Sequence, residues 1–379
     1  MKKTAVAVAV AVSALGMSQF AVADFVKDSK LSLDLRNYYI NDDVDGGAEG
    51  GQWAQGFMLN YQSGYTAGTV GFGVDVFGAA GYQLAETGDG SGQLIAAGED
   101  GRLNKSAATL KARVGNTNAY VGGLRPVTPV YVNNDARLLP QMVEGVLVTN
   151  QDIDGLTLSL GHMTYLSERN QNGWDELGDS PFSLFGADYK VMDGLTAQYY
   201  YGQVQDDYQQ HFAGLKYSAN IAGGKLGADA RFFNTKEEGA DDANNLWSLL
   251  VNYSVAGHTV GFGYQQSSEE GKFRNVGKSK YLITERLMGA MHDADEGVSL
   301  VSYGFDFGTV GVKGLNASVI HQMGDDRAET DVVVGYTIPE GEFKGLGARL
   351  MHGMLTDDRV GESDKTQTRV IVSYSIPLM

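Results

Sequence analysis

The chain has 379 residues, no cysteine, and 46 acidic against 29 basic residues, for a formal net charge of −17. The lack of cysteine excludes a disulfide scaffold and a cysteine-linked lipid anchor, and the negative charge argues against nucleic acid as a partner. Glycine is frequent, at 51 residues, and proline is rare, at 6, as expected when most residues lie in hydrogen-bonded strands.

Residues 1–23 have the three parts of a secretory signal peptide. Lys2 and Lys3 give a positive start, residues 4–17 form an apolar run, and the small residues of Ala-Val-Ala at 21–23 suit signal peptidase. The run is shorter than the ~20 residues of a membrane helix, and no later stretch is apolar for long enough to be one. We therefore expect the signal peptide (1–23) to be removed and residues 24–379 to form one domain.

Apolar and polar residues alternate from the start of this mature chain to its end. In 29–39, 52–61, 69–77 and 369–378, aliphatic and aromatic residues share one face, while glycine, serine and charged residues share the other. Similar segments occupy 104–121, 140–150, 155–167, 181–191, 194–205, 207–218, 225–235, 244–255, 258–267, 297–307, 314–323, 329–339 and 346–356. A weaker candidate at 276–286 brings the total to 18 strands, an even number as is normal for bacterial barrels.

A soluble β-sandwich or β-helix is the alternative to a barrel. The apolar face of so many strands is too extensive for one soluble core, and the polar face suits a water-filled lumen. The pattern therefore predicts an all-β chain that forms a transmembrane antiparallel β-barrel.

The segment 121–141 interrupts the alternation. It holds three of the six prolines, Pro126, Pro129 and Pro140, which cannot donate to a strand ladder. It also mixes apolar residues with charged ones, which is unusual for a loop in free solvent. We expect it to fold into the barrel as a constriction loop that carries Asp135; an ordinary external loop is the alternative.

Several stretches, in this order, resemble the OprD family of substrate-selective outer-membrane porins: FVKDSKLSLDLRNYYIND at 25–42, QWAQGFMLNYQSGYTAGTVGFGVD at 52–75, GLRPVTPV with NNDARLLPQ within 123–141, and DKTQTRVIVSYS at 364–375. The resemblance implies a barrel of 18 strands whose third extracellular loop folds inward. It also implies a ladder of basic side chains along one pore wall, which matches Arg36, Lys111, Arg113, Arg125, Arg137, Arg349 and Arg369. This chain departs from the family where Ala348 precedes Arg349, in its shorter loops, and in ending on the non-aromatic Met379.

These observations predict a channel for passive, selective uptake of small water-soluble solutes, above all carboxylate-bearing nutrients such as organic acids, amino acids and small peptides. Two alternatives stay open: an oligosaccharide channel that resembles chitoporin, with Tyr199–Tyr201 and Tyr38–Tyr39 along its path, and a general diffusion porin with mild cation preference. The six histidines are scattered and no G-x-S-x-G or H-E-x-x-H motif occurs, so we expect neither an enzyme nor a cofactor. We also expect no transition-metal site, although the acidic loops suit Ca²⁺ or Mg²⁺.

The expected setting is the outer membrane of a Gram-negative bacterium. Its partners there would be membrane lipid and lipopolysaccharide, the barrel-assembly machinery, and the transported solutes. We expect a monomer or a weak homotrimer.

Overall fold

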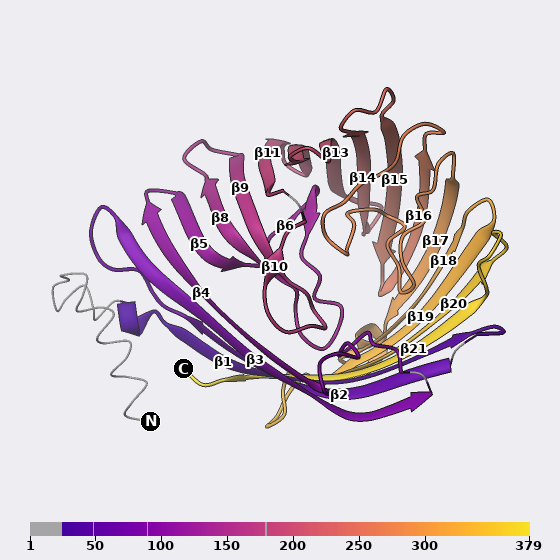
Figure 1. Ribbon diagram of the computed structural model, residues 1–379, viewed down its shortest axis with the longest axis horizontal. Helices are drawn as coiled ribbons and strands as arrows, with labels where there is room; N and C mark the ends of the chain where they lie inside the picture. The colour runs from indigo at the N-terminus through magenta and orange to yellow at the C-terminus, as the bar shows by residue number, and fades with distance from the viewer. Residues whose placement is uncertain (1–24, 48, 89, 179) are drawn as a thin grey trace.

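The computed structural model describes residues 25–379 except 48, 89 and 179, so the expected signal peptide lies outside the described residues. Each long strand pairs in antiparallel fashion with the next, and the last strand pairs with the first, which closes the sheet into a barrel of 18 strands. In Figure 1 this closure lies where yellow β21 runs beside indigo β1. The expected fold class is confirmed.

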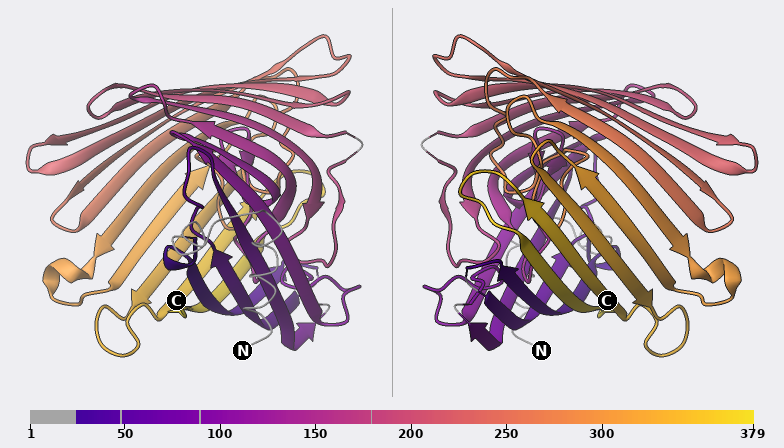
Figure 2. Two further views of the ribbon diagram at one scale, coloured as in Figure 1. Left: turned by 90° about the vertical axis from the view of Figure 1, so that its left-hand side faces the viewer. Right: turned by 90° about the vertical axis from the view of Figure 1, so that its right-hand side faces the viewer.

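The barrel strands are β1 (Lys30–Val44), β2 (Glu49–Gln62), β3 (Gly71–Gly88), β4 (Arg102–Val114), β5 (Thr117–Leu124), β8 (Met142–Asn150), β9 (Leu156–Ser167), β11 (Phe182–Met192), β12 (Leu195–Val204), β13 (Tyr208–Ile221), β14 (Gly224–Glu237), β15 (Asn244–Val255), β16 (His258–Ser267), β17 (Gly297–Asp306), β18 (Leu315–Met323), β19 (Arg327–Thr337), β20 (Gly347–Asp357) and β21 (Lys365–Pro377). Short strands β6 (Val127–Thr128) and β7 (Tyr131–Val132) pair with each other, and β10 (Asp175–Glu176) pairs in antiparallel fashion with the end of β9. Figure 2 shows the strong tilt of the barrel strands. Of the described helices, which include the 3-10 helix η1 (Phe307–Val310), none is long and apolar enough to cross a membrane.

Strand alternation sets the two faces of the wall. On β3 and β4 the apolar side chains of Phe72, Val76 and Leu110 are exposed on the outside, while Asp75 and Lys111 lie inside and form an ion pair. An apolar outer face of this kind is stable in lipid, because exposure of its apolar surface to water would cost free energy.

Two of the expected strands are wrong. The segment 104–121 holds parts of both β4 and β5, because the turn between them takes only Gly115 and Asn116 and leaves hardly any gap in the alternation. The segment 276–286 is not a barrel strand. It belongs to the long connection between β16 and β17, residues 268–296, which we call L7, and its Leu282 and Ile283 are buried.

The segment between β5 and β8, residues 125–141, which we call L3, folds into the barrel. Figure 1 shows its β6 inside the ring of strands, together with the orange L7. Its Val130 and Tyr131 pack with inward aromatic residues such as Phe212, and its Leu138 and Leu139 join a second buried cluster near β1. Burying an apolar side chain of this size contributes about 1.5–3 kcal/mol, which explains why L3 turns inward.

The lumen is therefore less polar than the alternation predicted. Inward positions carry buried aromatic and aliphatic residues, such as Tyr38, Phe212 and Phe233, at the level where L3 and L7 enter. The apolar side chains of the loops need an apolar wall to pack against, and this need overrides the simple rule of a polar inner face.

Inward glutamines tie these connections to the wall. The Nε2 of Gln210 donates to the Arg274 carbonyl and that of Gln265 to the Met291 carbonyl, both in L7. Gln52 binds Ile95, in the segment between β3 and β4, in the same way. All three glutamines are at most 1% exposed, and each donates to a backbone carbonyl of the connection; Gln265 also donates to the Thr284 hydroxyl, and Gln52 also accepts from the Ser91 hydroxyl.

Candidate functional site

Hydrogen bonds to the barrel wall hold L3 across the lumen. Arg36 of β1 donates to the Asp135 carboxylate at 2.8 Å and to the Arg137 carbonyl at 2.6 Å. The Tyr38 hydroxyl donates to the Ala136 carbonyl at 3.1 Å. Because these partners sit on neighbouring inward positions of one strand, β1 fixes where the second half of L3 crosses the barrel.

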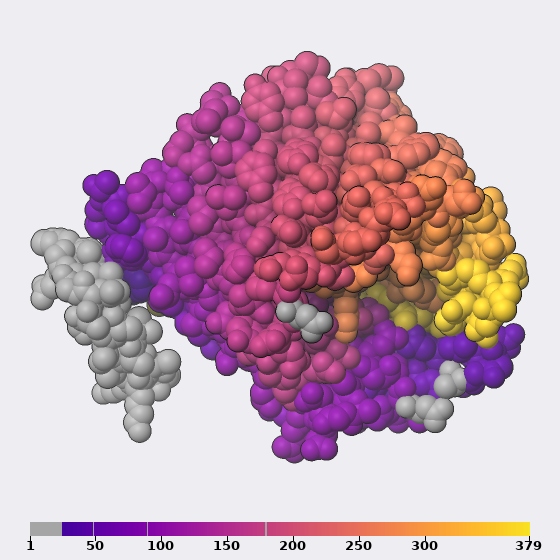
Figure 3. Space-filling view, turned by 45° about the horizontal axis from the view of Figure 1, so that its top comes forward, coloured from indigo at the N-terminus to yellow at the C-terminus, as the bar shows by residue number. Residues whose placement is uncertain are grey.

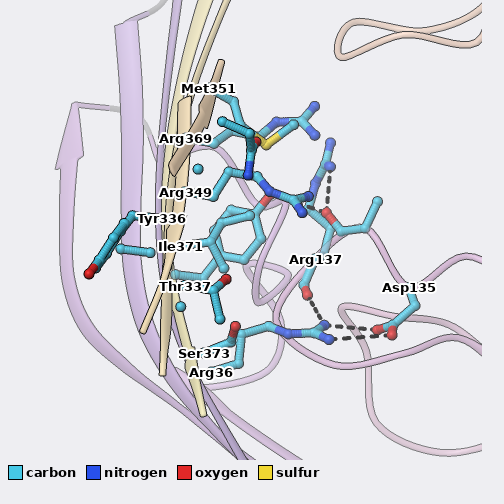
Figure 4. Close-up of a pocket in the computed structure, with 16 residues that line it drawn as sticks. Arg36, Asp135, Arg137, Tyr336, Thr337, Arg349, Met351, Arg369, Ile371 and Ser373 are labelled. Atoms are coloured by element: carbon cyan, nitrogen blue, oxygen red, sulfur yellow. Dashed lines mark hydrogen bonds and ion pairs between the residues drawn. The ribbon is translucent and has the colours of Figure 1, made fainter. Parts of the chain in front are cut away.

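Four arginines meet in a cavity of about 300 Å³ between L3 and the wall, which we call the arginine cavity. Arg36 comes from β1, Arg137 from L3, Arg349 from β20 and Arg369 from β21. In Figure 4 Arg349 and Arg369 lie above Arg36, whose guanidinium group faces Asp135, and Tyr336 points away. Segments far apart in the sequence thus build one site.

Only Arg36 has a carboxylate partner among the described residues. Its Nη1 and Nη2 lie 2.8 and 3.3 Å from the two oxygens of Asp135. Arg137 bonds Gln93 and the Ala136 carbonyl, and Arg369 bonds Gln367 and a carbonyl of L7. In the described part of the chain, no ion pair or side-chain hydrogen bond involves Arg349. Among the described residues, the cavity therefore holds three guanidinium groups that form no ion pair with a carboxylate.

Arg137 is 6% exposed and has other arginines near it. Burial, with repulsion from Arg369 and Arg169, lowers the pKa of Arg137 to about 9. An anion in the cavity would relieve this repulsion, because opposite charge favours the protonated form.

L7 forms the other side of the passage. The Leu287 carbonyl at its tip accepts a hydrogen bond from Arg369. Ser279 of L7 bridges to Val132 of L3, and Lys278 lies 3.2 Å from Glu168. The space-filling view shows a recess between the orange and the yellow parts of the chain (Figure 3).

The other expected ladder residues point into the lumen but lie outside the arginine cavity. Arg125 stacks over Phe77 and lines a second cavity of about 620 Å³, next to Arg36. Lys111 lies 2.6 Å from Asp75, and Arg113 stacks on the Tyr65 ring at 4.4 Å. The structure thus brings four of the seven residues together and spreads the other three along the wall.

The three prolines shape L3 rather than line the cavity. The Pro126 carbonyl accepts from Asn133 at 3.0 Å and so closes the base of the β6–β7 hairpin, with Pro129 in its turn. The Pro140 carbonyl accepts from Lys105 of β4 at 3.3 Å. Apart from Arg137, Asp135 is the one expected L3 residue among those described that lines the arginine cavity; the three prolines do not.

Sequence reasoning missed two basic residues near this region. Lys105 lies inside the barrel on β4, and its alternation with Leu110 and Lys111 could have revealed it. Arg169 lies in the irregular segment after β9, close enough to Arg137 to lower its pKa, and no periodicity marks such a position.

The tyrosines considered for a sugar path do not share one face. Tyr199 and Tyr201 lie on the outside next to His211, and only Tyr200 faces inward, bonded to Asp188. A continuous aromatic track therefore does not arise from this run.

Comparison with known proteins places the site in context. The family model for the outer membrane porin, OprD family, matches residues 23–378. Porin D of Pseudomonas aeruginosa is 30% identical, over 98% of both chains, and the porin-like protein GalP of Pseudomonas putida is 30% identical, over 94% of this chain and 93% of its own.

Solved structures agree with this likeness. OccK8 (OprE) of Pseudomonas aeruginosa is 35% identical and superposes with a TM-score of 0.86 over 94% of this chain and 100% of its own. The structure of OpdK with vanillate, from the same organism, is 29% identical with a TM-score of 0.87, over 93% and 100%.

Proposed function

The chain belongs to the OprD family of outer-membrane porins, and on that premise we propose that it is a channel for passive uptake of small carboxylate-bearing solutes. As a member of this family it is a channel and not an enzyme, in the outer membrane of a Gram-negative bacterium. The observation that carries the carboxylate preference is the arginine cavity, where Arg137, Arg349 and Arg369 have no carboxylate partner among the residues described.

The chemistry of guanidinium supports this substrate class. A carboxylate that enters a narrow passage loses part of its hydration shell, and guanidinium donors replace it. The planar fork of arginine matches the two oxygens of a carboxylate, whereas lysine offers a point charge. Vanillate, which is named with the relative OpdK, is itself a carboxylate.

Transport also needs release. One tight site would trap the solute, so conduction requires several weaker sites in sequence. Arg125, Lys111 and Arg113 lie beyond the arginine cavity and would accept the solute after it. Lys111 already pairs with Asp75, so a solute carboxylate would bind only weakly at this part of the path.

The sequence-based expectations about the surroundings stand as part of the proposal. Residues 1–23 would direct export and be removed, and the barrel-assembly machinery would insert the barrel beside lipopolysaccharide. L3 would act as the constriction loop. A monomer or weak homotrimer would suffice, because the arginine cavity is built within one chain.

The test is the reversal potential in a planar bilayer under a KCl gradient. Wild type should prefer anions, and Arg137→Ala combined with Arg349→Ala should shift the reversal potential toward cations. Lys190→Ala with Lys313→Ala is the matched control: it removes two charges as well, but from exposed ion pairs at the rim. Equal shifts in both double variants would contradict the proposal.

A second measurement separates charge from size. Liposomes that contain the channel should take up benzoate faster than benzamide, which has almost the same shape and no charge. The difference should shrink in the arginine double variant. Equal uptake of both solutes by wild type would favour a general diffusion pore.

A further inference from the structure

The tip of L7 is a tight turn that a carboxylate pair on the barrel wall holds. Residues 286–289 form the turn, in which the Arg286 amide donates to the Gly289 carbonyl at 3.0 Å. The Leu287 amide donates to Asp331 at 3.2 Å and the Met288 amide to Glu329 at 2.9 Å. We call residues 286–289 the L7 tip.

Both carboxylates are built into the wall. Glu329 and Asp331 lie on β19, two residues apart and therefore on the same face, and they are 2% and 4% exposed. Gln322 of the neighbouring β18 donates to Glu329 at 3.2 Å. The pair is thus set in a rigid sheet, whereas the L7 tip belongs to a long connection.

The wall also leaves room for the L7 tip. Gly353 of β20 pairs with Asp331, and a Cβ at this position would lie 2.9 Å from the Asp331 Oδ1 and 3.0 Å from the Met288 Cε. Any larger residue would push against both the carboxylate and the L7 tip. The glycine therefore permits the close approach of L7 to the wall.

Arg369 contacts the same turn from the other side. Its Nη2 donates to the Leu287 carbonyl, so one peptide turn is bonded to a carboxylate through its amide and to a guanidinium through its carbonyl. Arg369 is 4% exposed and lines the arginine cavity. The position of its guanidinium thus depends on where the L7 tip is held.

We propose that Glu329 and Asp331 are positioning residues for anion selectivity: they hold the L7 tip so that the Leu287 carbonyl orients Arg369 at the arginine cavity. This inference rests on the proposed function, because it assumes that Arg369 attracts the anion. In this role the carboxylates increase anion preference by positioning Arg369. Their own negative charge would by itself decrease anion preference.

That sign separates the proposal from a direct electrostatic role. If the two carboxylates acted as pore charges, their removal would raise anion preference. If they position Arg369, Glu329→Ala with Asp331→Ala should lower anion preference toward that of Arg369→Ala. A rise in anion preference in the double alanine variant would overturn the proposal.

The conservative variants sharpen the test. Glu329→Gln with Asp331→Asn removes the negative charge of the pair but keeps oxygen acceptors for the two amides, so its anion preference should stay closer to wild type than that of the alanine pair. In an Arg369→Ala background, the alanine pair should add nothing further, because residues that act through one group are not additive. Full additivity in that background would contradict the proposal. Thr330→Ala, between the two carboxylates but facing outward against His321, is the matched control and should behave as wild type.

A spin label reports the loop independently of selectivity. The chain has no cysteine, so Met288→Cys gives a single labelling site at the L7 tip. The label should be immobile in the otherwise native channel, mobile with the alanine pair, and mobile with Gly353→Val. A label that stays immobile with the alanine pair would overturn the docking role even if selectivity changed.

Failure of the proposed function would look different. If Arg349→Ala and Arg369→Ala leave the reversal potential unchanged, the arginine cavity does not select anions, whatever the label shows. If those variants alter selectivity and the alanine pair frees the label without altering it, the cavity selects anions and only the positioning role is wrong.

Discussion

A single carboxylate, Asp135, limits how much positive charge the arginine cavity presents. It lies across from Arg36, with its two oxygens 2.8 and 3.3 Å from the two terminal nitrogens of that residue. The Asp135 side chain is 51% exposed, so water screens the ion pair and the pair contributes little to the stability of the fold. Its main effect is therefore on the field inside the passage.

Asp135→Asn should increase the anion preference of the channel. The amide keeps the contact with Arg36 but no longer cancels its charge, so a fourth guanidinium becomes available to a passing anion. Exposed pairs contribute about 0.2–1 kcal/mol, which corresponds to a change in permeability ratio of up to about fivefold. The measurement is the reversal potential under a KCl gradient.

The double variant Arg36→Ala with Asp135→Asn supplies the control. It should return anion preference to about the wild-type level, because both members of the pair are then neutral. A gain that persists without Arg36 would mean that Asp135 acts on another group.

At this scale the sequence predicts the direction of side chains well and their partners poorly. Alternation with outward apolar neighbours correctly placed Arg36, Arg349 and Arg369 inside the barrel. It could not reveal that Asp135 pairs with Arg36, since 99 residues separate them and L3 has no period. Packing against the wall, and not local pattern, sets that contact.

Among the elements, L7 is the part that sequence reasoning misjudged most. Its residues 276–286 show weak alternation and were expected to form a strand, yet they lie in the lumen. Leu282 belongs to the buried cluster of inward aromatic residues, and Val276 and Tyr281 pack against the same cluster. Periodicity reports that one face is buried but not which surface buries it.

L7 should loosen when the pH falls below neutrality. Burial, together with the positive charges of Lys280 and Arg327, lowers the pKa of His292. The negative charge of Asp293 acts in the opposite direction. A histidine whose folded pKa is depressed stabilises the folded loop above its unfolded pKa of about 6.5, and this stability is lost as the pH falls through that value. The label at Met288→Cys should accordingly become more mobile between pH 7 and pH 5.

His292→Phe is the matched variant for this pH effect. Phenylalanine keeps the packing on Phe273, whose ring centroid lies 5.3 Å from that of His292, and cannot take up a proton. Its label should show no change between the two pH values. An unchanged pH response in this variant would assign the effect to another group.

For the whole molecule, the net charge of −17 and the local field of the arginine cavity oppose each other. The screening length is about 10 Å at 0.1 M salt and about 30 Å at 0.01 M. Arginines that line a narrow passage act within a few ångströms, whereas the exposed acids on the rim lie farther from the solute. Local residues should therefore set the selectivity at ordinary salt.

Asp241→Asn with Asp242→Asn tests this division. Both aspartates are exposed in the turn between β14 and β15. Their neutralisation should leave the reversal potential unchanged when both sides of the membrane contain at least 0.1 M KCl, and should raise anion preference only near 0.01 M. A clear shift at 0.1 M or above would show that rim acids reach the passage.

The overall architecture is the part that the sequence predicts most completely. Alternation repeated along the whole chain, with few prolines, leaves a closed barrel as the arrangement that satisfies every backbone group in lipid. The predicted total of 18 strands is right because two errors cancel. The sequence predicts β4 and β5 as one strand, and it predicts a strand in L7 that does not form. A two-residue turn such as Gly115–Asn116 is too short to interrupt the period.

The buried glutamines at the strand ends make the connections exchangeable. Gln52, Gln210 and Gln265 each donate to a backbone carbonyl of the segment that they hold, and these bonds do not depend on which side chains the segment carries. Loop sequences can then diverge, or be grafted from one barrel to another, while the same clamps receive them. The wall offers the same hydrogen-bond partners to different connections, so substrate preference can change while the membrane-embedded strands stay the same.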